Sequence, residues 1–317
     1  MKAFMWEKYG PPETLRMAEV EKPAPEADQV LVKVLAISVN PADWRCLRGR
    51  PLFSRATLGL LRPKHAILGG DIAGQVEAVG SGVTQFRPGD EVYANLLDHG
   101  HGSFAEYVSV PVDVMSVKPA NLSFEEAAAV PMAAVTALQG FRRHGEIQPG
   151  RTVLINGGSG GIGTFAVQIA KSHGAVVTGV TSTRNIDLVR SLGADHVVDY
   201  TKTDFGRAGQ RYDRILDTVG NRSVADLRRA LAEGGKAAVV GFTSMGKLLG
   251  ISLRGGKNVA MVSAHVTTKD LMLLSELIEA GHVRPQIDRR YPFEEIPAAI
   301  AYLEQGHARG KVVAGVA

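Results

Sequence analysis

The sequence has almost no cysteine, since Cys46 is the only one among 317 residues. One cysteine excludes an internal disulfide and every zinc or iron–sulfur site built from several thiolates. A chain so poor in cysteine suits a reducing compartment, and we expect a cytoplasmic protein.

Long apolar runs and a strong charge of one sign are missing as well. No run approaches the roughly 18 apolar residues of a membrane-spanning helix, and the first residues, MKAFMWEK, carry charge where a signal peptide needs an apolar core. The formal net charge is only +4, too small to indicate a nucleic-acid-binding surface. We therefore expect no membrane and no nucleic acid among the partners. The length and the ordinary hydrophobic content predict a globular protein of two domains.

Glycine, in contrast, is abundant, with 36 residues. Many of these glycines end helices in the second half, where short strands alternate with helical patterns. The expected strands are residues 152–156, 175–181, 196–199, 214–217, 236–241 and 258–263. This alternation predicts an α/β fold with a Rossmann-type, doubly wound parallel sheet.

The first 120 residues have a different texture. Strand patterns at residues 30–37, 71–79 and 107–112, with turns between them, predict a β-rich barrel or sandwich. Residues 48–64 are basic and irregular, and we expect either a lid or a solvated surface loop. Ser123 and Glu126 have the spacing of a capping box, which predicts that a helix begins there.

The strongest motif is the glycine loop at residues 158–163, which has the pattern G-x-G-x-x-G between a predicted strand and a predicted helix. Its first glycine permits a tight turn, its second lets the backbone approach a pyrophosphate, and its third lets helix and strand pack closely. The helix N-terminus adds partial positive charge. We therefore expect a dinucleotide to be held by Gly158, Ser159, Gly160, Gly161, Ile162 and Gly163.

The end of the second strand indicates which dinucleotide binds. An NAD site usually has an acidic residue about 20 residues after the glycines, but residues 181–184 read Thr-Ser-Thr-Arg. Arg184 can pair with a 2′-phosphate, and Ser182 and Thr183 can donate hydrogen bonds to it. These residues predict NADPH as the cofactor, and Tyr200 is a further candidate contact at the adenosine end.

Several segments, taken in order along almost the whole chain, resemble the medium-chain dehydrogenase/reductase superfamily and its zinc-independent, NADPH:quinone oxidoreductase-like branch. The matching segments are residues 36–43, 68–80, 86–92, 102–108, 127–137, 158–171, 192–195 and 212–217. This resemblance implies a discontinuous GroES-like catalytic domain, residues 1–122 and 266–317, around a Rossmann cofactor-binding domain, residues 123–265.

The resemblance also raises the question of a metal. Zinc-dependent members carry a Cys, a Gly-His-Glu segment and a second Cys at places that look like Asn40, Gly70-Asp71 and Met132 here. A neutral amide and a thioether are poor zinc ligands, so we expect no metal site.

Without a Lewis acid, quinones and α,β-unsaturated carbonyls remain suitable hydride acceptors. The resemblance therefore implies a zinc-free quinone reductase, with an enone or alkenal reductase and a low-turnover NADPH-binding protein as alternatives. We expect Asn40 to donate to the substrate oxygen, or to stabilise the turn before Pro41, and Asp43 to orient its neighbours. Arg45 stands where many relatives carry a tyrosine, so a proton donor at that place is in doubt.

By the same resemblance, further cofactor contacts are expected from Thr136, Gly241, Phe242, Thr243, Arg309 and Lys311. A homodimer is implied through the edge strand Asn258–Ser263. His99 and His101 lie in a glycine-rich stretch and suit surface positions, with proton donation as the alternative.

Overall fold

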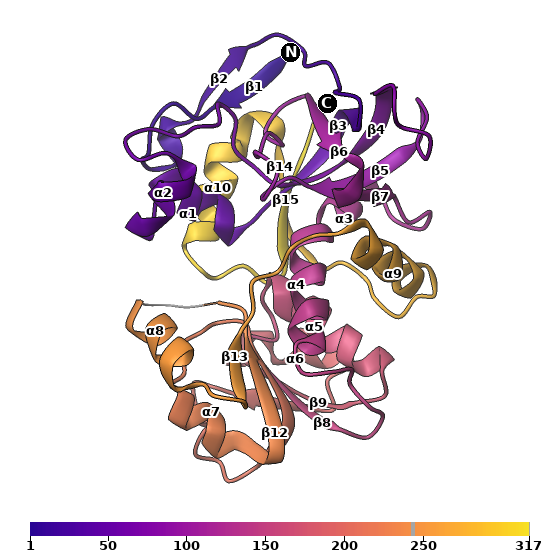
Figure 1. Cartoon of the computed structure of the whole chain (residues 1–317). Helices are drawn as coiled ribbons and strands as arrows, with labels where there is room; N and C mark the ends of the chain where they lie inside the picture. Colours follow the sequence, from indigo (N-terminus) through magenta and orange to yellow (C-terminus); the bar gives the residue numbers. More distant parts are fainter. Residues whose placement is uncertain (242–244, 317) are drawn as a thin grey trace. The chain divides into compact units, whose positions relative to one another are not determined.

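The computed structural model describes residues 1–241 and 245–316 and divides the chain into two compact units (Figure 1). Unit 1 is discontinuous and comprises Met1–Met132, Val266–Glu279 and Ile287–Ala317. Unit 2 comprises Ala133–His265 and Ala280–Gln286.

The first unit is built on a seven-stranded sheet in the order β14-β15-β3-β4-β5-β7, with β6 paired to β3. Its pairs are antiparallel except for β14 and β15. The strands are β3 (Gln29–Val39), β4 (Asp71–Val79), β5 (Glu91–Asn95), β6 (Tyr107–Pro111), β7 (Met115–Val117), β14 (Ile287–Pro292) and β15 (Lys311–Gly315). A separate hairpin-like pair is formed by β1 (Lys2–Met5) and β2 (Arg16–Glu19).

The last strand, β15, lies between β14 and β3. It runs antiparallel to β3, with Val312 opposite Val39. This register places Lys311 beside the carboxyl end of β3, next to Asn40. The sheet therefore joins two segments from opposite ends of the sequence at one point.

The helices of unit 1 follow local sequence signals. Helix α1 (Pro41–Arg48) begins with a proline at its first position and ends at Gly49, whose φ of 58° is left-handed. The segment 48–64, expected to be irregular, contains the turns η2 (Leu52–Ser54) and α2 (Arg55–Leu58). The other helices and 3-10 turns are α3 (Phe124–Ala128), α9 (Thr268–Glu279), α10 (Ile296–Glu304), η1 (Pro12–Thr14), η3 (Val112–Val114) and η5 (Phe293–Glu295).

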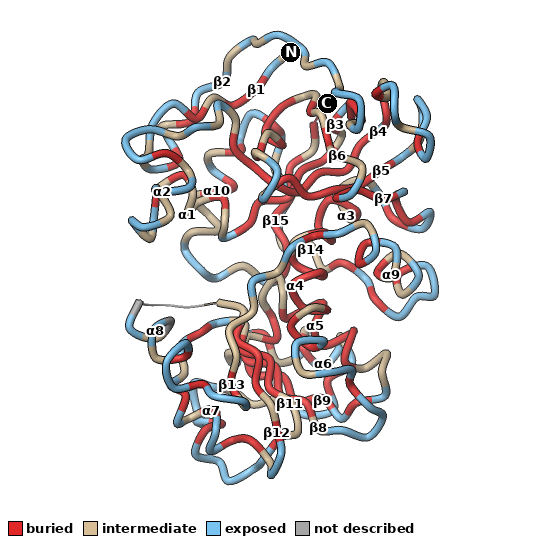
Figure 2. Tube along the Cα trace, viewed as in Figure 1, coloured by how far each residue is buried: buried red, intermediate tan, exposed pale blue. Residues whose placement is uncertain are grey.

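The second unit holds a six-stranded parallel sheet in the order β10-β9-β8-β11-β12-β13. The strands are β8 (Thr152–Asn156), β9 (Val176–Thr181), β10 (His196–Asp199), β11 (Tyr212–Asp217), β12 (Leu231–Val239) and β13 (Val259–Met261). Counted from β8, this is the 3-2-1-4-5-6 order of a Rossmann sheet, and it confirms the predicted fold class. Figure 2 shows its central strands as buried.

The topological switch point of this sheet lies between β8 and β11, and ligands of such sheets bind at the carboxyl ends of the strands there. The accompanying helices and turn are α4 (Pro131–Arg142), α5 (Gly161–Ser172), α6 (Ile186–Ser191), α7 (Val224–Ala230), α8 (Met245–Arg254) and η4 (Thr183–Asn185). None of the helices in the described part of the chain has the length and apolar character to cross a membrane.

The join between the two halves of the sequence follows the predicted signals. Ser123 and Glu126 form the capping box that begins α3. Helix α3 ends at Ala128, and Pro131 opens α4, because proline is tolerated in the first turn of a helix. Residues 123–132, assigned to the cofactor domain from the sequence, lie in unit 1, where α3 packs on β3 and β4.

Candidate functional site

The glycine loop of unit 2 connects β8 to α5 at the switch point of the sheet. Gly160 is the N-cap of α5 in extended conformation, and the helix proper starts at Gly161. The first N–H groups of a helix have no partner within it and carry partial positive charge, which suits a phosphate. A Cβ at Gly160 would find only the carbonyl oxygen of Gly157 nearby, at 3.5 Å. The loop therefore presents bare backbone at the place where a pyrophosphate is expected.

Two other glycines shape this loop. A Cβ on Gly163 would lie 2.0 Å from the carbonyl oxygen of Gly157, so only glycine lets the first turn of α5 pack on the loop. The left-handed residue of the turn is Gly157, with a φ of 91°, one residue before the first glycine of the motif. Gly158 donates its N–H to Val180, which ties the loop to the end of β9.

Ser159 fixes the loop to the next strand through a network that the sequence did not indicate. Its hydroxyl oxygen accepts hydrogen bonds from Thr181 at 2.7 Å and from the side-chain amide of Asn185 at 3.1 Å. All three residues are buried. The hydroxyl is therefore used to hold the loop against β9 and α6.

The adenosine-end candidates gather at the carboxyl ends of the neighbouring strands β9 and β10. Thr183 and Arg184 are exposed, Ser182 is half-buried, and Tyr200 is exposed. The structure adds Asp199, whose carboxylate accepts the Thr183 hydroxyl at 2.5 Å.

Asp199 is an acidic residue at the edge where the sequence indicated none. The Thr183 hydrogen bond and the Thr201 hydroxyl hold the pKa of Asp199 below its usual range. The carboxylate is therefore ionised but occupied, since its other oxygen accepts Thr201 at 2.7 Å. The acid comes from β10 rather than β9, so a search along one strand could not find it.

Asp217 ends β11 on the other side of the switch point. One carboxylate oxygen accepts the Asn156 side-chain amide at 2.8 Å and the N–H groups of Val219 and Gly220. The second oxygen is buried without a hydrogen-bond partner. Asp217 thus holds the end of β8, where the glycine loop begins, to the turn after β11.

The remaining predicted cofactor contacts lie in different settings. Thr136 is buried on α4, Gly241 is half-buried just after β12, and Arg309 is exposed before β15. A Cβ on Gly241 would lie 3.0 Å from the Thr218 carbonyl oxygen, so the backbone passes closely there. Phe242 and Thr243 lie outside the described residues.

Unit 1 contains a buried polar network centred on Asp71, the first residue of β4. One carboxylate oxygen accepts the Asn95 side-chain amide at 2.7 Å and the Met132 backbone N–H at 3.0 Å. The other accepts the Asn40 side-chain amide at 2.8 Å and faces the Lys311 ammonium group at 3.3 Å. The Asp71 and Lys311 side chains are 0% and 3% exposed. The charges are therefore removed from water and compensated by each other and by hydrogen bonds.

Asn40 and Lys311 have partners that differ from those expected. The Lys311 ammonium group donates to the Asn40 side-chain oxygen at 2.6 Å, so it belongs to this network. The Asn40 amide nitrogen donates to Asp71 and, at 3.3 Å, to the Ser38 carbonyl. Both of its hydrogens are engaged, which differs from the free donor expected for a substrate oxygen.

Asp43 lies beside the network and is buried. One oxygen accepts the Asn40 backbone N–H at 2.6 Å, and the other is buried without a partner. Burial raises the pKa of Asp43 to about 7, against the lowering effect of the Asn40 N–H. The charge of Asp71 raises this pKa further and that of Lys311 lowers it. Asp43 therefore exchanges its proton near neutral pH.

This arrangement decides whether a zinc ion fits where zinc-dependent relatives bind one. The three places singled out from the sequence do meet, because Asp71 is bonded to Asn40 and to the Met132 backbone. The Asn40 side chain and the Asp71 carboxylate are already hydrogen-bonded, and both contact the cationic Lys311. A divalent cation would have to displace the ammonium group and use an amide and a thioether as ligands. The residues do not fit zinc.

The two histidines of the glycine-rich stretch differ in burial. His99 is exposed, as expected for a surface loop. His101 is 6% exposed, has a φ of 63°, and packs its ring edge-to-face against Trp6, so the surface position expected for it was wrong. Burial lowers the pKa of His101 to about 4, and the nearby His65 lowers it further. His101 is therefore neutral at physiological pH.

Cys46, on α1, is half-buried. Burial raises the pKa of the Cys46 thiol to about 12, with a further contribution from the charge of Asp43. The thiolate, which is the reactive form, is therefore scarce at neutral pH.

Comparison with known families matches most of the chain. A family model described as "Alcohol dehydrogenase GroES-like domain" matches residues 26–120. A second, described as "Zinc-binding dehydrogenase", matches residues 192–313.

Individual proteins match almost the whole length of this chain. It is 36% identical to the NADPH-dependent alkenal/one oxidoreductase, chloroplastic, of Arabidopsis thaliana, over 99% of this chain and 79% of that protein. It is 33% identical to the chloroplast envelope quinone oxidoreductase homolog of Arabidopsis thaliana, over 99% and 98%. The solved structure of the quinone oxidoreductase from Coxiella burnetii matches with a TM-score of 0.89 and 31% identity, over 100% and 99%.

The buried ion pair can be tested by Lys311→Met. We expect the free energy of unfolding in urea to fall by about 3–5 kcal/mol, because Asp71 would keep a buried charge without its cation. The double variant Lys311→Met/Asp71→Asn should recover part of this loss. Lys257→Met, at an exposed lysine, is the control and should change little. Equal effects of the two lysine variants would contradict the network.

The raised pKa of Asp43 predicts a pH-dependent stability. An unfolded Asp has a pKa near 3.9, so the folded state keeps a proton that the unfolded chain releases from about pH 4 upwards. The stability due to this proton is complete below about pH 4, falls as pH rises, and is gone above about pH 7. Asp43→Asn should remove this fall.

Urea unfolding at several pH values measures the difference. Between about pH 4 and about pH 8 the variant should gain on the order of 4 kcal/mol relative to wild type. Asp187→Asn, at a fully exposed aspartate on α6, is the matched control. Parallel profiles for wild type and Asp43→Asn would refute the assignment.

Proposed function

Since the chain belongs to the medium-chain dehydrogenase/reductase superfamily, in its quinone oxidoreductase-like branch, we propose that it is a zinc-free, NADPH-dependent reductase of quinones. The observation that carries the zinc-free part is the Lys311 ammonium group, bonded to Asn40 and Asp71 where a metal would be expected. The model described as zinc-binding covers residues 192–313, and none of the three candidate ligand places lies within them.

NADPH, when bound, supplies a hydride. In unit 2, the bare backbone of the glycine loop and the start of α5 would hold the pyrophosphate. Arg184, Ser182 and Tyr200 would receive the 2′-phosphate, with Arg184 as the cation. Asp199 repels a phosphate less strongly than a free carboxylate would, because Thr183 and Thr201 donate to it.

In unit 1, the chain would bind the quinone and polarise its carbonyl groups without a metal. We assign Asn40 and Asp43 to positioning, because their polar atoms are bonded inside the network around Asp71. The charges of Lys311 and Asp71 compensate each other in this network, and the fixed dipoles of such a preorganised arrangement are effective in a site that excludes water. A quinone is already electrophilic, so it accepts a hydride without a Lewis acid.

A second candidate is the reduction of the double bond of enones and alkenals. One full-length relative is named an alkenal/one oxidoreductase, and another, from Solanum lycopersicum, is named 2-methylene-furan-3-one reductase. Hydride addition to an enone delocalises charge onto oxygen as it does in a quinone. The same site would therefore serve both reactions.

The proposal includes assembly and location. The short strand β13 is the edge of the parallel sheet, and an edge with free backbone groups invites pairing. We propose that the segment Asn258–Ser263 pairs with its equivalent in a homodimer. A cytoplasmic location stays a prediction, since the relatives named above include chloroplast proteins.

The function is tested by oxidation of NADPH with a panel of quinones, enones and aldehydes, with and without a chelator. We expect turnover with quinones, hydroquinone as product, and rates unchanged by chelation. A saturated ketone as the principal product would favour the second candidate. Loss of activity on chelation would refute the zinc-free site, and binding of NADPH without oxidation by any acceptor would refute the enzyme.

The cofactor preference is tested by Arg184→Ala. Loss of a charge-assisted contact should raise KM for NADPH by roughly tenfold or more, while KM for NADH stays nearly unchanged. Arg190→Ala, at an exposed arginine of α6 that pairs with Asp187, serves as the control. A wild-type preference for NADH, or equal effects on both cofactors, would overturn the role of Arg184.

A further inference from the structure

Residues 50–64 of unit 1, which we name the basic flap, are not used by the proposed reaction. They lie in a stretch, residues 44–70, that contains five arginines and one lysine but no aspartate or glutamate. In a chain whose acidic and basic residues nearly balance, so long a stretch without acid is a local concentration of positive charge.

The flap also exposes large apolar side chains. Leu52 is 71% exposed, Phe53 58%, Leu60 74% and Leu61 89%. They form two pairs of sequence neighbours, one at η2 and one in the loop after α2. Apolar groups of this size gain free energy when they leave water. Their clustering within ten residues marks an interaction surface rather than scattered surface leucines.

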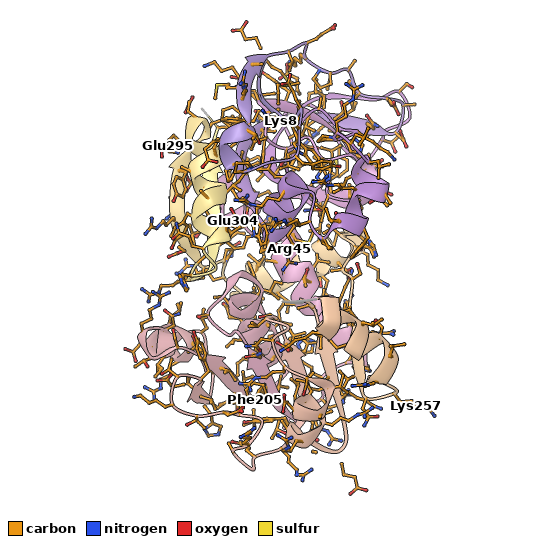
Figure 3. All side chains as sticks on the ribbon, turned by 90° about the vertical axis from the view of Figure 1, so that its left-hand side faces the viewer. Lys8, Arg45, Phe205, Lys257, Glu295 and Glu304 are labelled. Atoms are coloured by element: carbon orange, nitrogen blue, oxygen red, sulfur yellow. The ribbon has the colours of Figure 1, made fainter. Side chains whose placement is uncertain are left out.

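Other residues fix the flap in place, so these side chains are held outward. Arg48 forms a bidentate ion pair with Glu304 of α10, with one N–O distance of 2.7 Å. Arg55 lies 4.3 Å from the centre of the Tyr9 ring, and the Tyr9 hydroxyl donates to the Gly59 carbonyl. Figure 3 faces this side of the molecule, with Glu304 labelled on the yellow helix.

The remaining basic side chains of the flap are Arg50, Arg62 and Lys64, and all three are exposed and lie within three residues of an apolar pair in the sequence. We propose that the basic flap docks on an anionic lipid surface. Leu52–Phe53 and Leu60–Leu61 would enter the headgroup region, while the three cations would contact lipid phosphates. Stable surface attachment needs two such signals, an apolar one and a basic one, and the flap carries both.

Charge complementarity favours this occupant over a second copy of the chain. Two copies meeting through their flaps would bring two sets of cations together with no acid in either stretch, which is repulsive in a symmetric contact. The expectation of no membrane partner rested on the absence of a spanning run, and that absence does not address contact with a membrane surface. The docking itself is independent of the proposed function; only its benefit, access to acceptors dissolved in lipid, rests on that function.

The test is sedimentation of the full-length protein with phosphatidylcholine vesicles that contain or lack phosphatidylglycerol. We expect binding to the anionic vesicles, weakened by salt, and little binding to neutral ones. Leu60→Ser/Leu61→Ser and Arg62→Gln/Lys64→Gln should each lower the partition coefficient about tenfold or more. All these positions are exposed, so the variants should keep the thermal stability of wild type.

Matched controls make the changes elsewhere. Leu249→Ser/Leu253→Ser alters two exposed leucines of α8, and Lys257→Gln/Lys269→Gln alters two exposed lysines. Both should bind vesicles like wild type, and every variant should keep turnover with a water-soluble quinone.

Absence of wild-type binding to anionic vesicles, or equal losses in the controls, would refute the docking. A flap variant that changes the oligomeric state in size-exclusion chromatography would instead assign the surface to a second copy. Loss of turnover in all proteins, with vesicle binding intact, would count against the proposed function alone.

Discussion

The buried contact between Lys311 and Asp71 is the interaction on which unit 1 depends. It joins β15 to β4, two strands of the seven-stranded sheet that lie on either side of β3. Removing both charges from water is costly, and the cost is offset only because Asn40 and Asn95 complete the hydrogen bonding. A substitution that removed either Lys311 or Asp71 would leave the other as a buried charge without its partner. The same contact keeps an ammonium group inside unit 1, where the Asp71 carboxylate compensates its charge.

The parts of the fold that depend on short-range sequence could be predicted. Strands β4, β8 and β10 begin and end where the apolar patterns placed them, and the capping box at Ser123 opens a helix. The glycine loop lies between β8 and α5 as its motif requires. These features depend on neighbouring residues, whose spacing carries the information. Strands β1, β2, β5, β7 and β14 and helices α1 and α8 were missed, because they are short, or because their patterns do not distinguish a strand or helix from a loop.

The polar contacts of the site could not be predicted in the same way. Lys311 and Asn40 are 271 residues apart in sequence, and only the pairing of β15 with β3 brings them together. Asp199 reaches Thr183 from the neighbouring strand β10. His101 is buried and packs against Trp6, which lies 95 residues earlier in the chain. In each case the residue type was visible, but its partner was set by tertiary structure.

The scarcity of cysteine has a consequence for the proposed reduction of electrophilic quinones. Quinones and enones alkylate thiolates, and a protein that reduces them meets these compounds at its own surface. Cys46 is the single thiol of the chain, and burial keeps it protonated by raising its pKa to about 12. In the proposed reaction the protein would thus offer its acceptors very little thiolate to alkylate.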